Sequence, residues 1–273
     1  MKKTIGMMML AALTVVLSAC GGGNDLQQVA DKAAKQLPGA LPAVGAVEGL
    51  QMGQEENTVE VKTVMDEAFV KYVASDKADL SEVKKTVVYA LLNGGNTVQA
   101  LLQRIGQKDG TLKFVDSKYP DAAFAISGKE IKEAMDGVGR LSKTDKGLAM
   151  MQALAAIDQA GVPLKLNDEA TLTKVSIDKD DKQLELEFTY DEGKGKLKAG
   201  ADGENKMKSY MSGLYRTKRS GGMELNEGLV ALGSAAADAG YGVKHDVKGS
   251  STGTELEFDY NSYLMNNYVN GLQ

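Results

Sequence analysis

A single histidine limits the catalytic chemistry that this sequence can support. His245 is the only histidine among 273 residues and stands next to Asp246 on a predicted strand. No Gly-x-Ser-x-Gly turn, the usual position of a hydrolase serine, occurs in the chain. Because Cys20 is the only cysteine, the common zinc sites built from several histidines and cysteines are excluded. We therefore interpret His245 as a surface residue of a strand, and we predict no catalytic residue and no metal site.

Three aspartates begin like a calcium-binding loop but do not complete one. Asp178, Asp180 and Asp181 have the spacing of the first ligands of such a loop. The loop needs a glycine at its sixth position and a glutamate at its twelfth, where this sequence has Gln183 and Thr189. The segment is therefore predicted to be a turn between two strands.

A stretch rich in glycine and lysine, residues 193–206, has part of the composition of a phosphate-binding loop. Its glycines, Gly193, Gly195 and Gly200, match the spacing of neither the P-loop nor the dinucleotide fingerprint. We predict a solvated loop and no nucleotide or other cofactor.

Four glutamates on two predicted strands are candidates for a carboxylate pair that cleaves a glycan. Such a pair is defined by its separation in space, so the sequence alone neither identifies nor excludes it. If the Leu and Phe residues between them face the core, the four side chains lie on the solvated face of a sheet. These residues are Glu185, Glu187, Glu255 and Glu257.

Tyrosines gather in the last third of the chain, close to basic residues. Exposed tyrosines beside cations would suit a glycan, peptidoglycan or protein ligand. The alternative is that these tyrosines stabilise hairpins and helix contacts. The candidate ligand-binding residues are Tyr210, Tyr215, Arg216, Lys218 and Arg219.

The first residues have the layout of a secretory signal peptide. Lys2 and Lys3 precede a short apolar run, Ile5 to Leu17, and small residues follow it. This run is too short to span a bilayer, which takes about 20 residues.

The end of this leader, Leu17-Ser18-Ala19-Cys20, resembles the lipobox of bacterial lipoproteins. The resemblance covers the leader alone. It implies that residues 1–19 are removed, that Cys20 receives a diacylglycerol thioether, and that the new amino terminus is acylated. Two or three acyl chains anchor a protein durably in a membrane, where one would not. By analogy with lipoprotein sorting in Gram-negative bacteria, Gly21 after the cysteine indicates the outer membrane, on its periplasmic face or at the cell surface.

Overall charge argues against a nucleic-acid partner. The chain has 32 lysines and arginines against 37 aspartates and glutamates, a net charge of −5. A moderately acidic protein has no general electrostatic attraction for nucleic acid.

Apolar periodicity predicts an α+β fold of antiparallel hairpins covered by helices. We expect the lipidated amino terminus and a tether over residues 20–57, a first α+β unit over 58–140, and a second α+β region with two hairpins over 141–273. The alternative for residues 38–57 is an extension packed on the protein, since several of its residues are apolar.

A local pattern suggests internal repetition. A helix ends in glycine, two extended segments follow, and the second contains Phe-x-Ile or Phe-x-Tyr. The pattern occurs three times, around Gly106 and Phe124, Gly161 and Phe188, and Gly240 and Phe258.

Two function classes follow from these observations. The first is a non-catalytic envelope lipoprotein that binds an envelope protein or glycan, or helps assembly. The second is a hydrolase that acts on glycan or peptidoglycan through a carboxylate pair.

Overall fold

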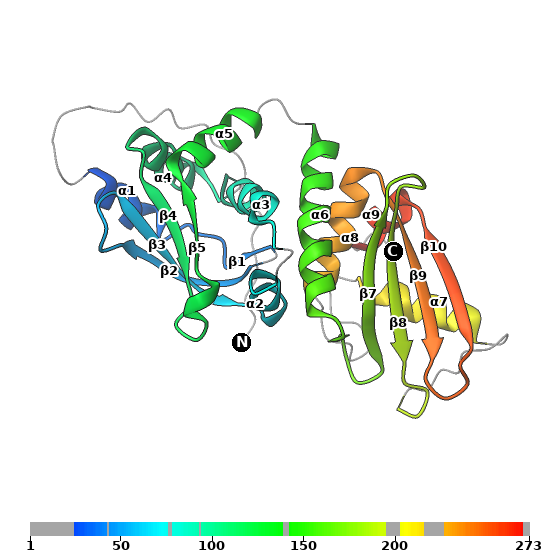
Figure 1. The fold of residues 1–273 in the computed structure, drawn as a ribbon. Coiled ribbons are helices and arrows are strands. Elements are labelled where there is room, and N and C mark those ends of the chain that lie inside the picture. Colours follow the sequence, from blue (N-terminus) through cyan, green and yellow to red (C-terminus); the bar gives the residue numbers. More distant parts are fainter. Residues whose placement is uncertain are drawn as a thin grey trace, which may run out of the picture.

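The structure is a computed structural model that describes residues 25–42, 44–75, 78–92, 94–138, 142–194, 203–215 and 227–269. The predicted leader and Cys20 lie outside the described residues. Two five-stranded sheets with helices packed on them confirm the predicted α+β fold (Figure 1).

The first unit contains one sheet whose strands lie in sequence order. Neighbouring strands are antiparallel except β3 and β4, which are parallel and joined by helices. Its elements are α1 (Asp25–Ala33), β1 (Ala40–Leu41), β2 (Gly45–Met52), β3 (Thr58–Met65), α2 (Glu67–Val73), α3 (Leu80–Leu92), α4 (Asn96–Gln107), β4 (Thr111–Val115), the 3₁₀ turn η1 (Pro120–Ala122), β5 (Phe124–Ser127) and α5 (Gly128–Val138).

The second unit repeats this arrangement. Its strands also lie in sequence order, and only β8 and β9 are parallel. Its elements are α6 (Lys143–Gly161), β6 (Leu164–Lys165), β7 (Ala170–Asp178), β8 (Gln183–Tyr190), α7 (Glu204–Gly213), α8 (Glu227–Ala239), β9 (Gly242–Gly249), β10 (Glu255–Tyr260) and α9 (Ser262–Val269).

Strand register shows that the two units are copies of one motif. The hairpins β2–β3 and β7–β8 each carry one bulge on the first strand, at Glu48 and Thr173. In both hairpins the bulge follows three regular cross-strand pairs, so the extra residue occupies the same place. A parallel strand and a second hairpin then follow in both units. The repeated motif is therefore helix, hairpin, helices, hairpin, helix.

The predicted threefold repeat is thus replaced by a twofold one. The first and third predicted copies are the hairpins β4–β5 and β9–β10, which close the two units. The second predicted copy is β7–β8, which opens the second unit. Its counterpart β2–β3 lacks the Phe motif and begins inside the predicted tether.

Over residues 38–57 the structure has strands β1 and β2 in place of a tether, in agreement with the alternative of a packed extension, and the described chain before them forms α1. Helix α1 buries Leu26 and Ala30 in the first core, and Leu41 and Val44 are buried after it. Strand β2 alternates poorly because its bulge changes the face that each following residue presents.

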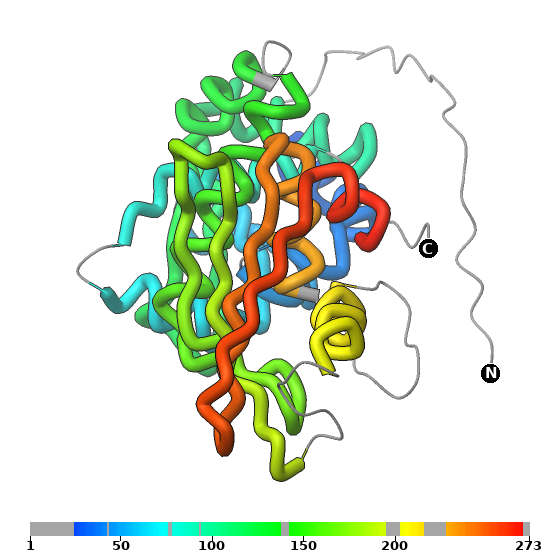
Figure 2. The backbone as a smooth tube through the Cα atoms, turned by 90° about the vertical axis from the view of Figure 1, so that its right-hand side faces the viewer, coloured from blue at the N-terminus to red at the C-terminus, as the bar shows by residue number. Residues whose placement is uncertain are grey.

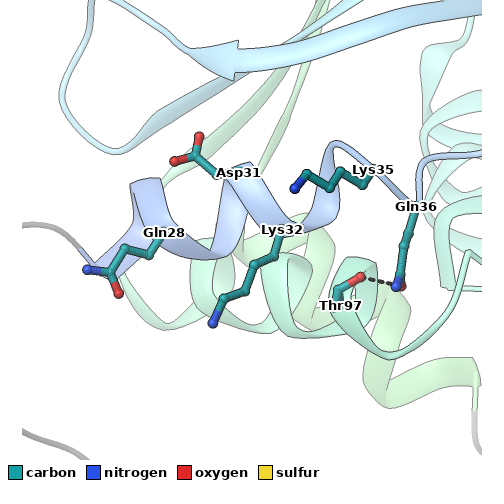
Figure 3. A pocket seen from close by; sticks show the side chains of 6 residues that line it. All are labelled: Gln28, Asp31, Lys32, Lys35, Gln36 and Thr97. Carbon is teal, nitrogen blue, oxygen red and sulfur yellow. Dashed lines mark hydrogen bonds between the residues drawn. The ribbon is translucent and has the colours of Figure 1, made fainter.

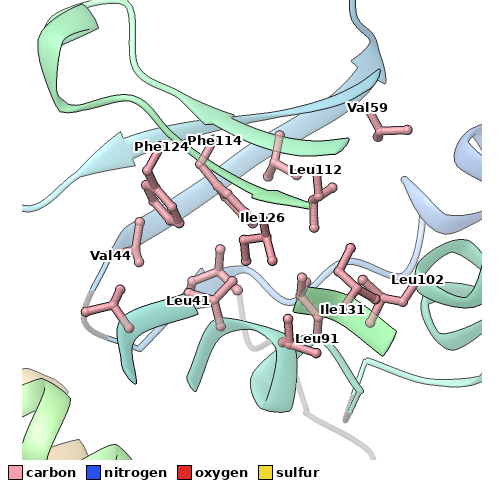
Figure 4. Close-up of a cluster of buried hydrophobic side chains, with 14 of the residues drawn as sticks. Leu41, Val44, Val59, Leu91, Leu102, Leu112, Phe114, Phe124, Ile126 and Ile131 are labelled. Carbon is pink, nitrogen blue, oxygen red and sulfur yellow. The ribbon is translucent and has the colours of Figure 1, made fainter. Parts of the chain in front are cut away.

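The first core lies between its sheet and the helices on one face. Figure 4 shows Phe114 and Phe124 on neighbouring strands, with Leu91 and Leu102 facing the sheet from the helices. The two phenylalanine rings stack with their centroids 4.7 Å apart.

Helix α6 belongs to both cores and lies between the two units (Figure 1). Ala153 and Ile157 pack into the first core. Met151, Leu154 and Ala155 pack into the second. A helix that is apolar around most of its circumference is expected to be buried on several sides.

Two glycines let α6 approach its neighbours closely. A Cβ atom on Gly147 would lie 2.6 Å from the backbone nitrogen of Ala239 in α8, and one on Gly161 would lie 2.6 Å from the Cβ of Ala68 in α2. No side chain fits at either place without moving the neighbouring helix.

Replacing Gly147 with alanine tests this packing. We expect the Gly147→Ala variant to lower the free energy of unfolding by about 1–3 kcal/mol, because the added methyl group forces α6 and α8 apart. Denaturant unfolding measures the change. Gly137→Ala in α5 is the matched control, since nothing lies within 4 Å of its added Cβ and alanine favours a helix. A Gly147→Ala protein as stable as the Gly137→Ala control would contradict the close approach.

Candidate functional site on the outer face of the second sheet

A groove of about 530 Å³ crosses the outer face of the second sheet. Figure 2 looks onto this side of the molecule, with β7 to β10 in front. The groove is lined mainly by polar side chains that include Thr173, Glu187, Thr189, Asp246, Lys248, Glu255 and Glu257.

Strand register brings charged residues into one row across the groove. Lys174, Glu187, Asp246 and Glu257 are direct cross-strand neighbours on β7, β8, β9 and β10. Their side chains share the outer face because alternate residues of each strand are buried. One row therefore places three carboxylates beside a single lysine.

Lysines neutralise part of this charge. Lys174 Nζ lies 2.6 Å from Glu187 Oε1, and Lys244 Nζ lies 2.8 Å from Glu257 Oε2. The hydrogen bond to Glu187 raises the pKa of Lys174, and that to Glu257 raises the pKa of Lys244. Because the side chains are partly exposed, such pairs contribute little to stability.

Asp246 is the carboxylate least compensated by these lysines. Partial burial raises its pKa, and repulsion by Glu257 and Glu187 adds to the rise. Lys244, whose Nζ lies 3.9 Å from Asp246 Oδ1, lowers the pKa more than either glutamate raises it, but burial outweighs this effect and the pKa stays raised.

Carboxylates outnumber lysines over the whole outer face, so this face is negatively charged. The carboxylates are Asp178, Glu185, Glu187, Asp246, Glu255, Glu257 and Asp259, and the lysines are Lys165, Lys174, Lys244 and Lys248. The prediction that the four glutamates lie on the solvated sheet face is confirmed.

The predicted tyrosine and arginine patch does not form around Tyr215. This side chain is fully buried in the second core. Tyr210 is half-buried and its hydroxyl accepts a hydrogen bond from Asn167 Nδ2 at 2.9 Å. The three predicted basic residues, Arg216, Lys218 and Arg219, lie outside the described residues.

His245 is buried, which corrects the prediction that it lies on the surface. Its exposed fraction is 0 %, and its Nε2 lies 2.5 Å from the hydroxyl of Tyr215. The rings of Phe188 and Tyr260 lie with their centroids 4.9 Å from the imidazole. Burial lowers the pKa of His245 to about 3, so the imidazole is neutral and serves as a core side chain.

The sequence did contain a signal for this burial. His245 alternates in step with Val243 and Val247, which face the core. In the first unit the same register position, opposite the inward residue Val61, is held by Phe114. Residue type suggested the surface, whereas strand parity indicated the interior.

The aspartate segment forms the predicted turn. Asp178 Oδ1 accepts hydrogen bonds from the backbone nitrogens of Asp180 and Asp181 at 2.9 and 3.0 Å. Within the described residues, no group of three or more His, Cys, Asp or Glu side chains is placed to hold a metal ion.

A second hollow, of about 500 Å³, lies on the surface of the first unit between α1 and α4. Figure 3 shows Lys32 projecting from α1, Lys35 in the turn after it, and the hydroxyl of Thr97 donating to Gln36. Its lining is polar and it contains no buried reactive group, so it has weaker features of a site than the sheet groove.

Comparison of the chain with models of protein families, with curated proteins and with solved structures finds no match. Among the described residues, no helix combines the length and the apolar character that crossing a bilayer requires.

The buried histidine makes stability depend on pH in a defined direction. The pKa of His245 is about 3 in the folded protein, against an ordinary value of 6.5 that we take for the unfolded chain. Between pH 3 and pH 6.5 the unfolded chain therefore binds a proton at this residue and the folded protein does not. Stability from this group is therefore complete above pH 6.5 and is lost as the pH falls. We expect a loss of about 2 kcal/mol from this residue between pH 7 and pH 5.

The double variant His245→Phe/Tyr215→Phe isolates that contribution. It should lose about 2 kcal/mol less than the unmodified protein between pH 7 and pH 5, measured by urea unfolding. His245→Phe alone should cost about 1–3 kcal/mol at pH 7, because it leaves the Tyr215 hydroxyl buried without an acceptor. Equal pH dependence in the double variant and the unmodified protein would show that His245 is not buried as a neutral side chain.

Proposed function

We propose that this protein is a lipid-anchored lipoprotein of the bacterial envelope that binds a partner without catalysis. The lipobox resemblance supports attachment through Cys20 and removal of residues 1–19. Gly21 supports the outer membrane as the destination. The two α+β units would then form the part of the protein that meets a partner outside the bilayer.

The outer face of the second sheet is the surface we assign to that partner. It is a wide groove on an open sheet, its carboxylates are engaged by lysines, and its net charge is negative. Charge complementarity favours a partner protein with a basic surface, and steering by such a field increases the rate of association. This charged groove is the single observation that carries the binding hypothesis.

A hydrolase acting on glycan or peptidoglycan is the second candidate, and one observation favours it. The raised pKa of Asp246, beside Glu187 and Glu257, is a property that a general acid needs. Asp246→Asn discriminates the two: it should abolish turnover of envelope polymer by a hydrolase, whereas a binding protein has no turnover to lose.

Charge reversal in the groove tests the binding surface. In whole cells, photocrosslinking from Thr189 should capture a specific partner, and Glu187→Lys/Glu257→Lys should reduce its yield at least tenfold by repelling a basic surface. Glu60→Lys, on the outer face of the first sheet, is the matched control and should leave the yield unchanged. An unchanged crosslinking yield in Glu187→Lys/Glu257→Lys would contradict the assignment of this surface. An equal fall in yield in Glu60→Lys would contradict it as well.

Substitution of the predicted lipid attachment site tests the anchor separately. The Cys20→Ala protein should leave the membrane fraction, because no acyl chain remains to hold it. It should still fold, since both cores are built from residues after position 25. Membrane fractionation and circular dichroism check the two statements. A Cys20→Ala protein that resists extraction from the membrane would refute the lipobox interpretation.

A further inference from the structure

A hollow of about 290 Å³ lies between α3 and α5 in the first unit. Its wall is apolar where it meets the core, at Val88, Ile126 and Ala134, which are almost fully buried. Lys84 and Glu130 lie at its rim and form an ion pair at 2.8 Å. Pockets that bind small ligands begin at about this size and combine an apolar wall with a few polar groups.

The internal repeat shows what the second unit places at this position. Ile126 pairs with Leu112, and its counterpart Tyr260 pairs with Val243 in the same register. The helices that follow are also aligned, because each is capped in the same way. Glu130 donates its backbone N–H to the Ser127 hydroxyl at 3.2 Å.

In the second unit, Leu264 donates its backbone N–H to Asn261 Oδ1 at 2.9 Å. Glu130 and Leu264 are therefore the third residues of equivalent helices. Four residues further along, on the same face of the helix, the first unit has Ala134 and the second has Tyr268.

Helix α7 lies beside this position in the second unit. The hydroxyl of Tyr260 donates a hydrogen bond to the backbone oxygen of Lys208 in α7 at 3.1 Å.

The second unit fills the equivalent space with aromatic rings. Tyr268 packs edge-on against Tyr260, with 5.7 Å between ring centroids. Lys208 Nζ lies 5.7 Å from the centroid of Tyr260, within the range of a cation–π contact. The first unit has Ile126 and Ala134 in place of the two tyrosines and leaves a hollow there, with Tyr89 of α3 also in its lining.

We propose that the hollow between α3 and α5 binds an aromatic side chain of a partner polypeptide. The ring would take the place that Tyr268 holds in the second unit, against Ile126 and Ala134, with the Lys84–Glu130 ion pair at the rim. A free ring of this size would bind only in the roughly millimolar range, so a useful site requires a ring carried by a larger partner that also contacts the rim. This site is on the other unit from the sheet groove and does not depend on the proposed function.

Protein-observed methyl NMR on the full chain in detergent tests the site with N-acetyl-L-tyrosinamide as the probe. We expect saturable shifts at Val88, Ile126 and Ala134, and shifts at least threefold smaller with N-acetyl-L-leucinamide at the same concentration. No saturable shift, or equal shifts with both probes, would overturn the proposal. Tighter binding of p-cresol than of N-acetyl-L-tyrosinamide would indicate a small phenol as the ligand and would overturn the assignment of the ring to a partner polypeptide.

Two reciprocal variants make the test independent of one mutant's folding. Ala134→Tyr copies the second unit and should fill the hollow, raise the melting temperature and abolish the shifts. Tyr268→Ala copies the first unit and should lower the melting temperature and create a second probe site at Tyr260. Shifts that persist in Ala134→Tyr, or a Tyr268→Ala protein that gains no site, would contradict the equivalence on which the proposal depends.

Discussion

Contact of α6 with both cores is the interaction on which the rest of the structure depends. The helix opens the second unit, yet Ile157 and Ala153 complete the core of the first. Gly147 and Gly161 at its two ends set the distances to α8 and α2. The units are therefore joined head to tail: the equivalent of α6 in the first unit is α1, and the surface that α1 would offer to a preceding unit faces outward.

Head-to-tail contacts propagate unless the end surfaces differ from the internal ones. Cross-strand register aligns α1 with α6 so that Gln28 and Lys32 correspond to Ala153 and Ile157. The terminal face is thus polar where the internal face is apolar, as in the caps of repeat proteins. The hollow in Figure 3 is this capping surface, which explains why its lining is charged. The same packing that stabilises two units therefore does not recruit a third.

Local patterns in the sequence predicted the α+β class, the hairpins β4–β5, β7–β8 and β9–β10, and the solvated glutamates, because each depends on neighbours along the chain. They did not reveal the twofold repeat, since β3 and β4 are parallel and their pairing crosses three helices. His245 was misplaced for another reason: its strand parity with Val243 and Val247 indicated the interior, but its residue type was given more weight, and its contact with the Tyr215 hydroxyl joins distant segments. The tether was mispredicted because a bulged strand loses the alternation that identifies strands. The β3–β4 pairing and the contact between Tyr215 and His245 were missed because each joins segments far apart in the chain.

Comparison of the two units also distinguishes the features that the fold requires from those that it does not. In both units a carboxylate connects the ends of the two parallel strands. It follows the second parallel strand in the first unit and the first parallel strand in the second unit. Asp116, after β4, accepts from the backbone nitrogen of Met65 at the end of β3, at 2.6 Å. Glu192, after β8, accepts from the backbone nitrogen of Thr252 beyond β9, at 2.9 Å. A structural need is thus met twice by different residues, whereas the charged groove lies on the second unit and the unfilled hollow lies where the second unit has Tyr260 and Tyr268. Features that differ between the two units are not required by the fold. The charged groove and the hollow are therefore the surfaces on which we expect binding.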